Sequence, residues 1–107
     1  MSDPTPIDIN WDRLDAQKLE RMADVLRVIS HPIRLRIVEL LALQPLNVGE
    51  IKELIDEEMA HSLISHHLNR MRLMGLLIAR RNGASIEYSL AVPALCEIVR
   101  CARLCGT

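Results

Sequence analysis

Aromatic side chains are scarce in this sequence of 107 residues, which contains one Trp, one Tyr and no Phe. Domains that bind RNA or single-stranded DNA stack bases on aromatic side chains, so this composition argues against both classes. No apolar run approaches the roughly 18 residues of a membrane span, and the first residues lack the basic start and apolar core of a secretory signal. We therefore expect a cytoplasmic protein with no membrane partner, whose three cysteines are thiols rather than structural disulfides.

Charge is nearly balanced, with a formal net value of −1, but it is unevenly distributed. Residues 59–86 contain no acid, while four arginines and three histidines occur there. Residues 50–58 carry five acids against a single lysine. Most nucleic-acid-binding domains are basic overall, yet segregated charge leaves a local positive face on a near-neutral chain. The balance therefore does not exclude a duplex as the partner.

The acid-free stretch contains a two-sided helical pattern. Ile64, Leu68 and Met71 recur at spacings of four and three residues and predict a buried stripe. The opposite side consists of polar residues that can all donate hydrogen bonds, namely Ser62, Ser65, Asn69 and Arg72. A helix that buries one edge and offers donors on the other suits insertion into the major groove of DNA. From composition alone, an ordinary solvated helix face is an equally good interpretation.

The remaining segments predict a mainly α-helical chain with a small β-hairpin and one modest core. Pro32, the Asn47–Glu50 capping pair and the Asn82-Gly83 turn mark element boundaries. The predicted elements are helices over 12–29, 32–44, 48–55 and 60–74, strands over 76–81 and 85–90, and a last helix from Pro93. This order is that of a winged helix-turn-helix, with residues 1–10 as a mobile arm and residues 11–107 as the domain.

Several stretches carry a family resemblance, and their order and spacing together are specific. They are His31-Pro32-Ile33-Arg34-Leu35-Arg36-Ile37, Val48-Gly49-Glu50-Ile51, Ser65-His66-His67-Leu68 within the polar helix, and Arg80-Arg81-Asn82-Gly83 before Tyr88-Ser89-Leu90. With them, residues 20–104 resemble the ArsR/SmtB family of bacterial metalloregulatory repressors. The resemblance implies a homodimer whose first and last helices form the interface. It also implies binding to a palindromic DNA operator, and release when a metal or another inducer binds.

Two positions depart from the family pattern. Ala60 stands where the family usually has a serine or threonine that caps the recognition helix. The turn before it is a little longer than usual and carries the acids Asp56, Glu57 and Glu58. Neither change removes a groove-facing side chain, but both bear on the angle at which the helix is presented.

The resemblance identifies the polar helix face as a candidate DNA-reading surface. Its expected groove-facing residues are Ser62, Ser65, His66, Asn69 and Arg72, with Arg70 reaching a phosphate. His67 lies near Leu63 and Met71, so we expect a packed, hydrogen-bonded core histidine there. In the hairpin, Arg80 and Arg81 point to opposite sides of a strand. One of them is expected to contact phosphate beside the minor groove together with Asn82, and the other to be a solvated charge.

Metal-ligand patterns of the family are mostly missing. Residues 46–54 contain no cysteine and residues 91–107 contain no His or Asp, so neither the soft-metal site nor the zinc site of family members is reproduced. Cys96, Cys101 and Cys105 remain as sensing candidates, because thiolates favour soft ions such as As(III). Cys96 lies about 140° from Cys101 around a helix. One unbroken helix therefore cannot gather all three sulfurs, unless the end of the chain unwinds or the partner subunit contributes ligands.

Two other interpretations of the cysteines stay open. Cys96 shares a helix face with Arg100 and Arg103, which would favour its thiolate and suit a redox or persulfide switch. Alternatively, Cys101 packs as a small hydrophobe at a dimer interface and none of the cysteines senses anything. No cofactor is certain from the sequence.

These patterns together predict a homodimeric DNA-binding transcriptional repressor that an inducer releases from its operator. The alternative is a winged-helix module that binds proteins, motivated by the negative net charge and the acidic residues 56–58. We do not expect an enzyme, because the cysteines and histidines fall on separate predicted elements and no third orienting group accompanies them. No glycine loop of the phosphate-cradling kind is present either.

Overall fold

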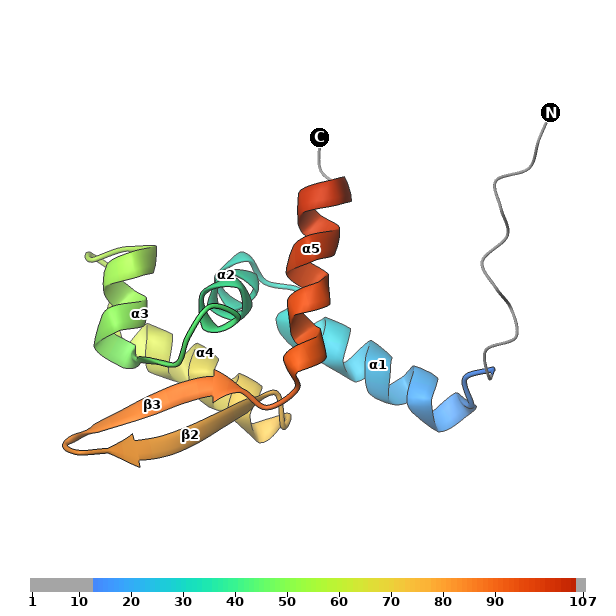
Figure 1. Cartoon of the computed structure of the whole chain (residues 1–107), viewed down its shortest axis with the longest axis horizontal. Helices are drawn as coiled ribbons and strands as arrows, with labels where there is room; N and C mark the ends of the chain where they lie inside the picture. Colours follow the sequence, from blue (N-terminus) through green and yellow to red (C-terminus); the bar gives the residue numbers. More distant parts are fainter. Residues whose placement is uncertain (1–12, 106–107) are drawn as a thin grey trace.

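A bundle of helices carries a β-hairpin on one side in the computed structural model, which describes residues 13–105 (Figure 1). The elements are α1 Ala16–Ile29, α2 Pro32–Leu41, β1 Leu46–Asn47, α3 Val48–Ile55, α4 His61–Leu73, β2 Leu77–Asn82, β3 Ser85–Leu90, the 3₁₀ turn η1 Pro93–Leu95 and α5 Cys96–Cys105. This is the mainly α-helical winged helix-turn-helix that the sequence predicts. The predicted arm over residues 1–10 lies outside the described residues.

Helix α1 begins later than predicted, at Ala16 rather than near residue 12. The reason is a side-chain cap: the carboxylate of Asp15 accepts a hydrogen bond from the backbone N–H of Lys18 at 2.8 Å. Val25 and Val28 are buried in the core, as is Ile29 at the end of the helix. The buried residues of the helix thus fall in its last two turns, while its first turn extends away from the bundle (Figure 1).

Helices α2 and α3 start where their local signals place them. The imidazole of His31 accepts from the N–H of Ile33 at 3.1 Å, and Pro32 occupies the first turn of α2, where no N–H is needed. Asn47 and Glu50 form the predicted capping box, with reciprocal bonds of 2.8 and 2.9 Å.

Helix α4 supplies much of the core and ends in a glycine-dependent motif. Ile64, Leu68 and Met71 are fully buried, which confirms the predicted apolar stripe. Beyond the helix, the N–H of Leu76 donates to the carbonyl of Met71 at 3.0 Å, and Gly75 adopts a φ of 82°. This is a Schellman arrangement, in which a left-handed residue lets the chain turn back toward the sheet.

The sheet has one more strand than predicted. The two-residue β1 pairs antiparallel with β3, so the strand order is β1-β3-β2. The hairpin turn also lies one residue later than Asn82-Gly83, because Asn82 still pairs with Ser85 and Gly83 takes the first turn position at φ 65°. The last helix differs as well, since Pro93 opens a 3₁₀ turn and α5 proper begins at Cys96.

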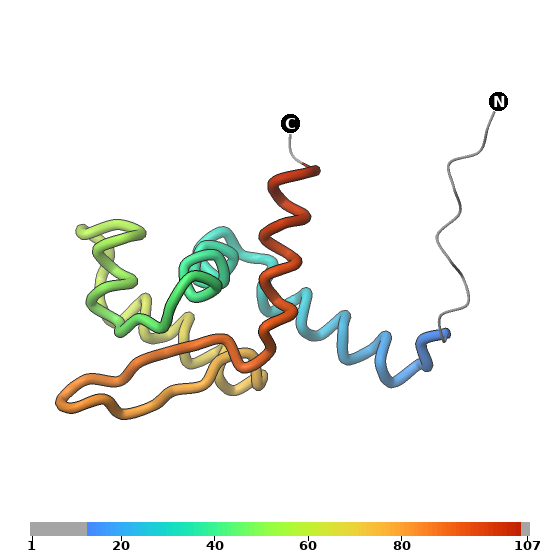
Figure 2. Tube along the Cα trace, viewed as in Figure 1, coloured from blue at the N-terminus to red at the C-terminus, as the bar shows by residue number. Residues whose placement is uncertain are grey.

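The elements separate into two regions. Figure 2 shows α1 and α5 away from the hairpin tip, while α3 and α4 lie beside the hairpin. The first and last helices therefore both lie away from the hairpin tip. The helix with the polar stripe lies against the β-hairpin.

Candidate nucleic-acid interface

The outer face of α4 is polar and accessible. Ser62, Asn69 and Arg72 are exposed and Ser65 is half-buried, while Ile64 on the opposite side is 0% exposed. The guanidinium of Arg72 donates to the side-chain oxygen of Asn69 at 2.8 Å. Two of the predicted groove-facing residues are therefore already joined, one helical turn apart. His66 and Arg70 are also exposed on this helix.

A groove of about 480 Å³ lies between α3, α4 and the hairpin. Its lining comprises Asn47, Val48 and Gly49 from the start of α3, His61 and Ser65 from α4, and Ala84, Ser85, Ile86 and Tyr88 from the hairpin. His61 was missed as a candidate from the sequence. Its spacing of four residues from Ser65 was the available signal, because residues so spaced share a helix face.

The hairpin distinguishes its two arginines by face. Residues paired across an antiparallel ladder share one side of the sheet, and Arg81 pairs with Ile86, which lines the groove beside α4. Arg80 pairs with Glu87 on the other side, where Glu87 also accepts from the amide of Asn82 at 3.0 Å. The face shared by Arg80 and Asn82 thus contains a carboxylate. Arg81 is the better placed of the two beside α4.

Two arginines attach α4 to the elements behind it. Arg21 of α1 donates to the carbonyl of Met74 at 2.7 Å, at the end of α4. Arg34 of α2 donates from Nε to Nδ1 of His67 at 3.0 Å, and from a terminal nitrogen to the carbonyl of Val28 at 2.8 Å. His67 is therefore the packed, hydrogen-bonded histidine that the sequence predicts. Burial lowers its pKa below the ordinary value, and the nearby His31, Arg34 and His66 lower the pKa further.

The three cysteines all lie exposed on α5. The helix is unbroken through Cys105, and the sulfurs of Cys101 and Cys105 are 3.4 Å apart. The hydrogen bond to Cys105 raises the pKa of the Cys101 thiol. Within residues 13–105, no three His, Cys, Asp or Glu side chains are grouped so that they could hold a metal ion. The structure therefore pairs two cysteines and does not assemble the set of three.

The arginines near Cys96 have carboxylate neighbours. A guanidinium nitrogen of Arg100 lies 3.8 Å from a carboxylate oxygen of Glu97, and one of Arg103 lies 3.9 Å from a carboxylate oxygen of Glu39 on α2. Glu39 also pairs with Arg36 on its own helix. Both arginines thus face an acid, which weakens the argument that they activate the thiol of Cys96.

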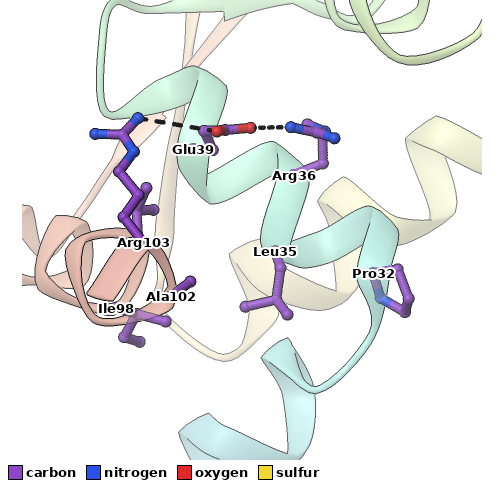
Figure 3. Close-up of a pocket in the computed structure, with 8 residues that line it drawn as sticks. Pro32, Leu35, Arg36, Glu39, Ile98, Ala102 and Arg103 are labelled. Atoms are coloured by element: carbon purple, nitrogen blue, oxygen red, sulfur yellow. Dashed lines mark hydrogen bonds and ion pairs between the residues drawn. The ribbon is translucent and has the colours of Figure 1, made fainter. Parts of the chain in front are cut away.

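The contact from Arg103 to Glu39 crosses a groove of about 320 Å³ between α2 and α5 (Figure 3). Apolar side chains from both helices line its floor, including Leu35, Ile98 and Ala102. The cysteine-bearing helix is thereby joined to α2, the helix whose Arg34 binds His67.

Comparison with known proteins agrees with this architecture. The family model described as bacterial regulatory protein, arsR family, matches residues 31–79, from the start of α2 into β2. The HTH-type transcriptional regulator Rv0081 of Mycobacterium tuberculosis is 36% identical over 81 residues, which cover 76% of this chain and 70% of that protein. The chain belongs to the ArsR family.

Solved structures of ArsR-like proteins superpose on it closely. The crystal structure of the transcriptional repressor PagR of Bacillus anthracis has a TM-score of 0.70 at 34% identity, covering 81% of this chain and 98% of PagR. The homodimeric winged helix-turn-helix domain of Mb0332 from Mycobacterium bovis has a TM-score of 0.69 at 24% identity. The match covers 88% of this chain and 87% of that domain. As an ArsR-family winged helix-turn-helix protein, the chain is a DNA-binding transcriptional regulator.

Among residues 13–105, no helix combines the length and the apolar character that a bilayer crossing requires.

Proposed function

We propose that this chain represses transcription by binding a palindromic operator as a homodimer, and that an inducer acting at α5 releases it. The observation that carries the proposal is the two-sided α4. Its inner stripe is buried, and its outer face offers donors beside a groove lined by Ile86 of the hairpin, the residue that pairs with Arg81. A helix of this kind reads base edges in the major groove, while the hairpin arginine contacts phosphate.

Dimerisation through the first and last helices is supported by apolar side chains that the single chain leaves uncovered. Leu19, Met22 and Leu26 of α1 are 54%, 42% and 48% exposed, and Leu104 of α5 is 73% exposed. Isolated exposed leucines are common on protein surfaces, but a stripe along one helix is typical of an interface. A two-fold axis through this end would present two α4 helices to two half-sites.

Fluorescence anisotropy with a labelled duplex from the chain's own promoter region tests the DNA proposal. A scrambled duplex of equal composition is the control, and titrations at several salt concentrations report phosphate contacts. We expect tighter binding to the promoter duplex, with two chains per operator and an affinity that falls steeply with salt. Equal binding to both duplexes, or binding insensitive to salt, would count against the proposal and favour the protein-binding alternative.

For the inducer, we propose As(III) bound by Cys101 and Cys105. Their sulfurs are 3.4 Å apart, and two metal–thiolate bonds of about 2.3 Å, the length found for zinc, can bridge such a separation. Arsenous acid would exchange two hydroxyl groups for the two thiolates, and the two thiol protons would leave as water. The adjacent Arg103–Glu39 contact offers a path from this pair to α2.

Titration of the reduced protein with arsenite, followed by calorimetry and by release of the promoter duplex, tests the inducer proposal. Cys101→Ser and Cys105→Ser should each lose both responses. Cys96→Ser, a change at an exposed cysteine of the same helix, should respond as the parent does. If all three variants behave alike, the cysteine pair is not the inducer site. Release by a persulfide donor but not by arsenite would favour the redox alternative.

A further inference from the structure

The junction of α1, α2 and α4 contains a hydrogen-bonded group that DNA contact does not require. Arg34 stands at its centre, because one guanidinium binds both the end of α1 and the middle of α4. The carbonyl of Val28 belongs to the last turn of α1, where carbonyls have no partner within the helix. The same side chain that satisfies this carbonyl therefore also fixes His67.

The hydrogen bond to His67 depends on protonation. Nδ1 of His67 accepts from Nε of Arg34, and a nitrogen can accept only when it carries no proton. Protonation would place two N–H donors and two positive charges face to face over 3.0 Å. His67 is 4% exposed, so water cannot easily take over as a partner.

The charged and titratable groups that face His67 all oppose its protonation. They are His31 before α2, whose ring lies 4.6 Å from that of His67, Arg34 on α2, and His66 on α4, whose ring lies 5.8 Å away. Each is a cation or can become one, and none is an acid. Acidification would therefore accumulate like charges in this junction.

We propose that neutral His67 is a positioning residue for the DNA-reading helix, and that its protonation releases α4 from α2 and weakens DNA binding. This inference rests on the proposed function, since it assigns α4 to the operator. The direction of the pH dependence distinguishes this inference from ordinary DNA binding. Acid ordinarily strengthens DNA binding, because surface histidines gain positive charge near the phosphates. A chain governed by His67 should show the opposite dependence.

The second attachment of α4 provides a matched control. Arg21 donates to the backbone carbonyl of Met74, an acceptor that does not titrate. Arg21→Gln removes an arginine anchor from the same helix, as a change at Arg34 does, but leaves the protonation of His67 untouched. His67→Gln keeps an oxygen that can accept from Arg34, yet cannot gain a proton.

The test measures affinity for the promoter duplex between about pH 7.5 and about pH 5.5 at constant ionic strength, a range that brackets the ordinary histidine pKa. Wild type should lose affinity on acidification, by less than about tenfold, because the folded pKa of His67 lies below the ordinary histidine value. His67→Gln should bind comparably at the upper pH and hold or gain affinity on acidification. Arg21→Gln should bind more weakly throughout and show the same acid loss as wild type. Identical profiles for wild type and His67→Gln overturn the inference.

Two further measurements decide the case if no duplex binds or if a variant is unfolded. ¹⁵N-histidine spectra of wild type should show an unprotonated Nδ1 on His67 at neutral pH, and a proton on Nδ1 there overturns the inference. Amide exchange of α4 should be faster in wild type than in His67→Gln at about pH 5.5 and equal near pH 7.5. Failure of DNA binding alone would thus refute the proposed function without deciding the role of His67.

Discussion

Arg72 and Asn69 form a hydrogen-bonded pair on the outer face of α4, with the guanidinium nitrogen 2.8 Å from the amide oxygen. The two side chains stand three residues apart, so one restricts the rotamers of the other before any DNA is present. Both side-chain types bind base edges in the major groove, since arginine recognises guanine and asparagine recognises adenine. A pair ordered in advance costs less conformational entropy on binding than two independent side chains.

Arg72→Gln should therefore reduce discrimination between the promoter duplex and the scrambled duplex, by about 1–3 kcal/mol if the arginine makes a bidentate base contact. Asn69→Ala leaves the charge but frees the guanidinium, so we expect a smaller loss of discrimination. The matched control is Arg70→Gln on the same helix, which should weaken both duplexes alike. Competition anisotropy measures the ratio of the affinities for the promoter duplex and the scrambled duplex. Equal losses of discrimination from Arg70 and Arg72 would contradict the assignment.

The hairpin arginines should differ in the salt dependence of binding. Arg81 lies on the side that faces the groove beside α4, whereas Arg80 is opposed by Glu87. Arg81→Gln should lower the slope of log affinity against log salt by about one per protomer. Arg80→Gln should change the slope less, because Arg80 shares its side of the sheet with the carboxylate of Glu87. The reverse order would show that the hairpin meets DNA by its other face.

Local signals predicted most of this fold, and long-range contacts account for what they missed. Spacings of three and four residues within one helix predict the buried stripe of Ile64 and Leu68 and the capping pair at Asn47. The strand β1 depends on Leu46 meeting Tyr88, more than forty positions away along the chain. The hydrogen bond from Arg34 to His67 likewise joins residues that are 33 positions apart, so no local sequence pattern predicts it. The sequence could identify His67 as buried, but not its partner.

Among the glycines of the described chain, Gly75 should be the least tolerant of substitution. Its φ of 82° lies in the left-handed region, which L side chains rarely adopt, although an added Cβ would make only an ordinary contact, 3.5 Å from the guanidinium of Arg21. Gly75→Ala should lower the free energy of unfolding by about 1–2 kcal/mol. Gly49→Ala, in the first turn of α3, should instead be neutral or raise it by about 0.5 kcal/mol, because its Cβ would make only an ordinary contact. Urea denaturation of both variants measures the contrast, and equal effects would contradict it.

Ala60 leaves the start of α4 without a side-chain cap, although its backbone already has the extended N-cap conformation. Ala60→Ser should therefore stabilise the protein by about 1 kcal/mol, since the hydroxyl can accept from an N–H in the first turn. Ala60→Gly should recover less than the serine variant. Thermal denaturation of the three proteins checks the order. A serine variant no more stable than the parent would show that other groups already satisfy the first turn of α4.

His67 should also make stability depend on pH. Its pKa in the folded chain is lowered, chiefly by burial, so between that value and about 6.5 the unfolded chain binds more protons than the folded one. The free energy of unfolding should therefore be flat above about pH 6.5, fall by at most about 1.4 kcal/mol per pH unit as the pH drops from there to the folded pKa, and level off below it. His67→Gln should lack this component, whereas His66→Gln, at an exposed position of the same helix, should retain it. Urea denaturation of the three proteins at several pH values isolates the contribution as a difference in slope. If wild type and His67→Gln lose stability in parallel, then Arg34 does not hold a neutral imidazole, and the attachment of α4 to α2 is indifferent to acid.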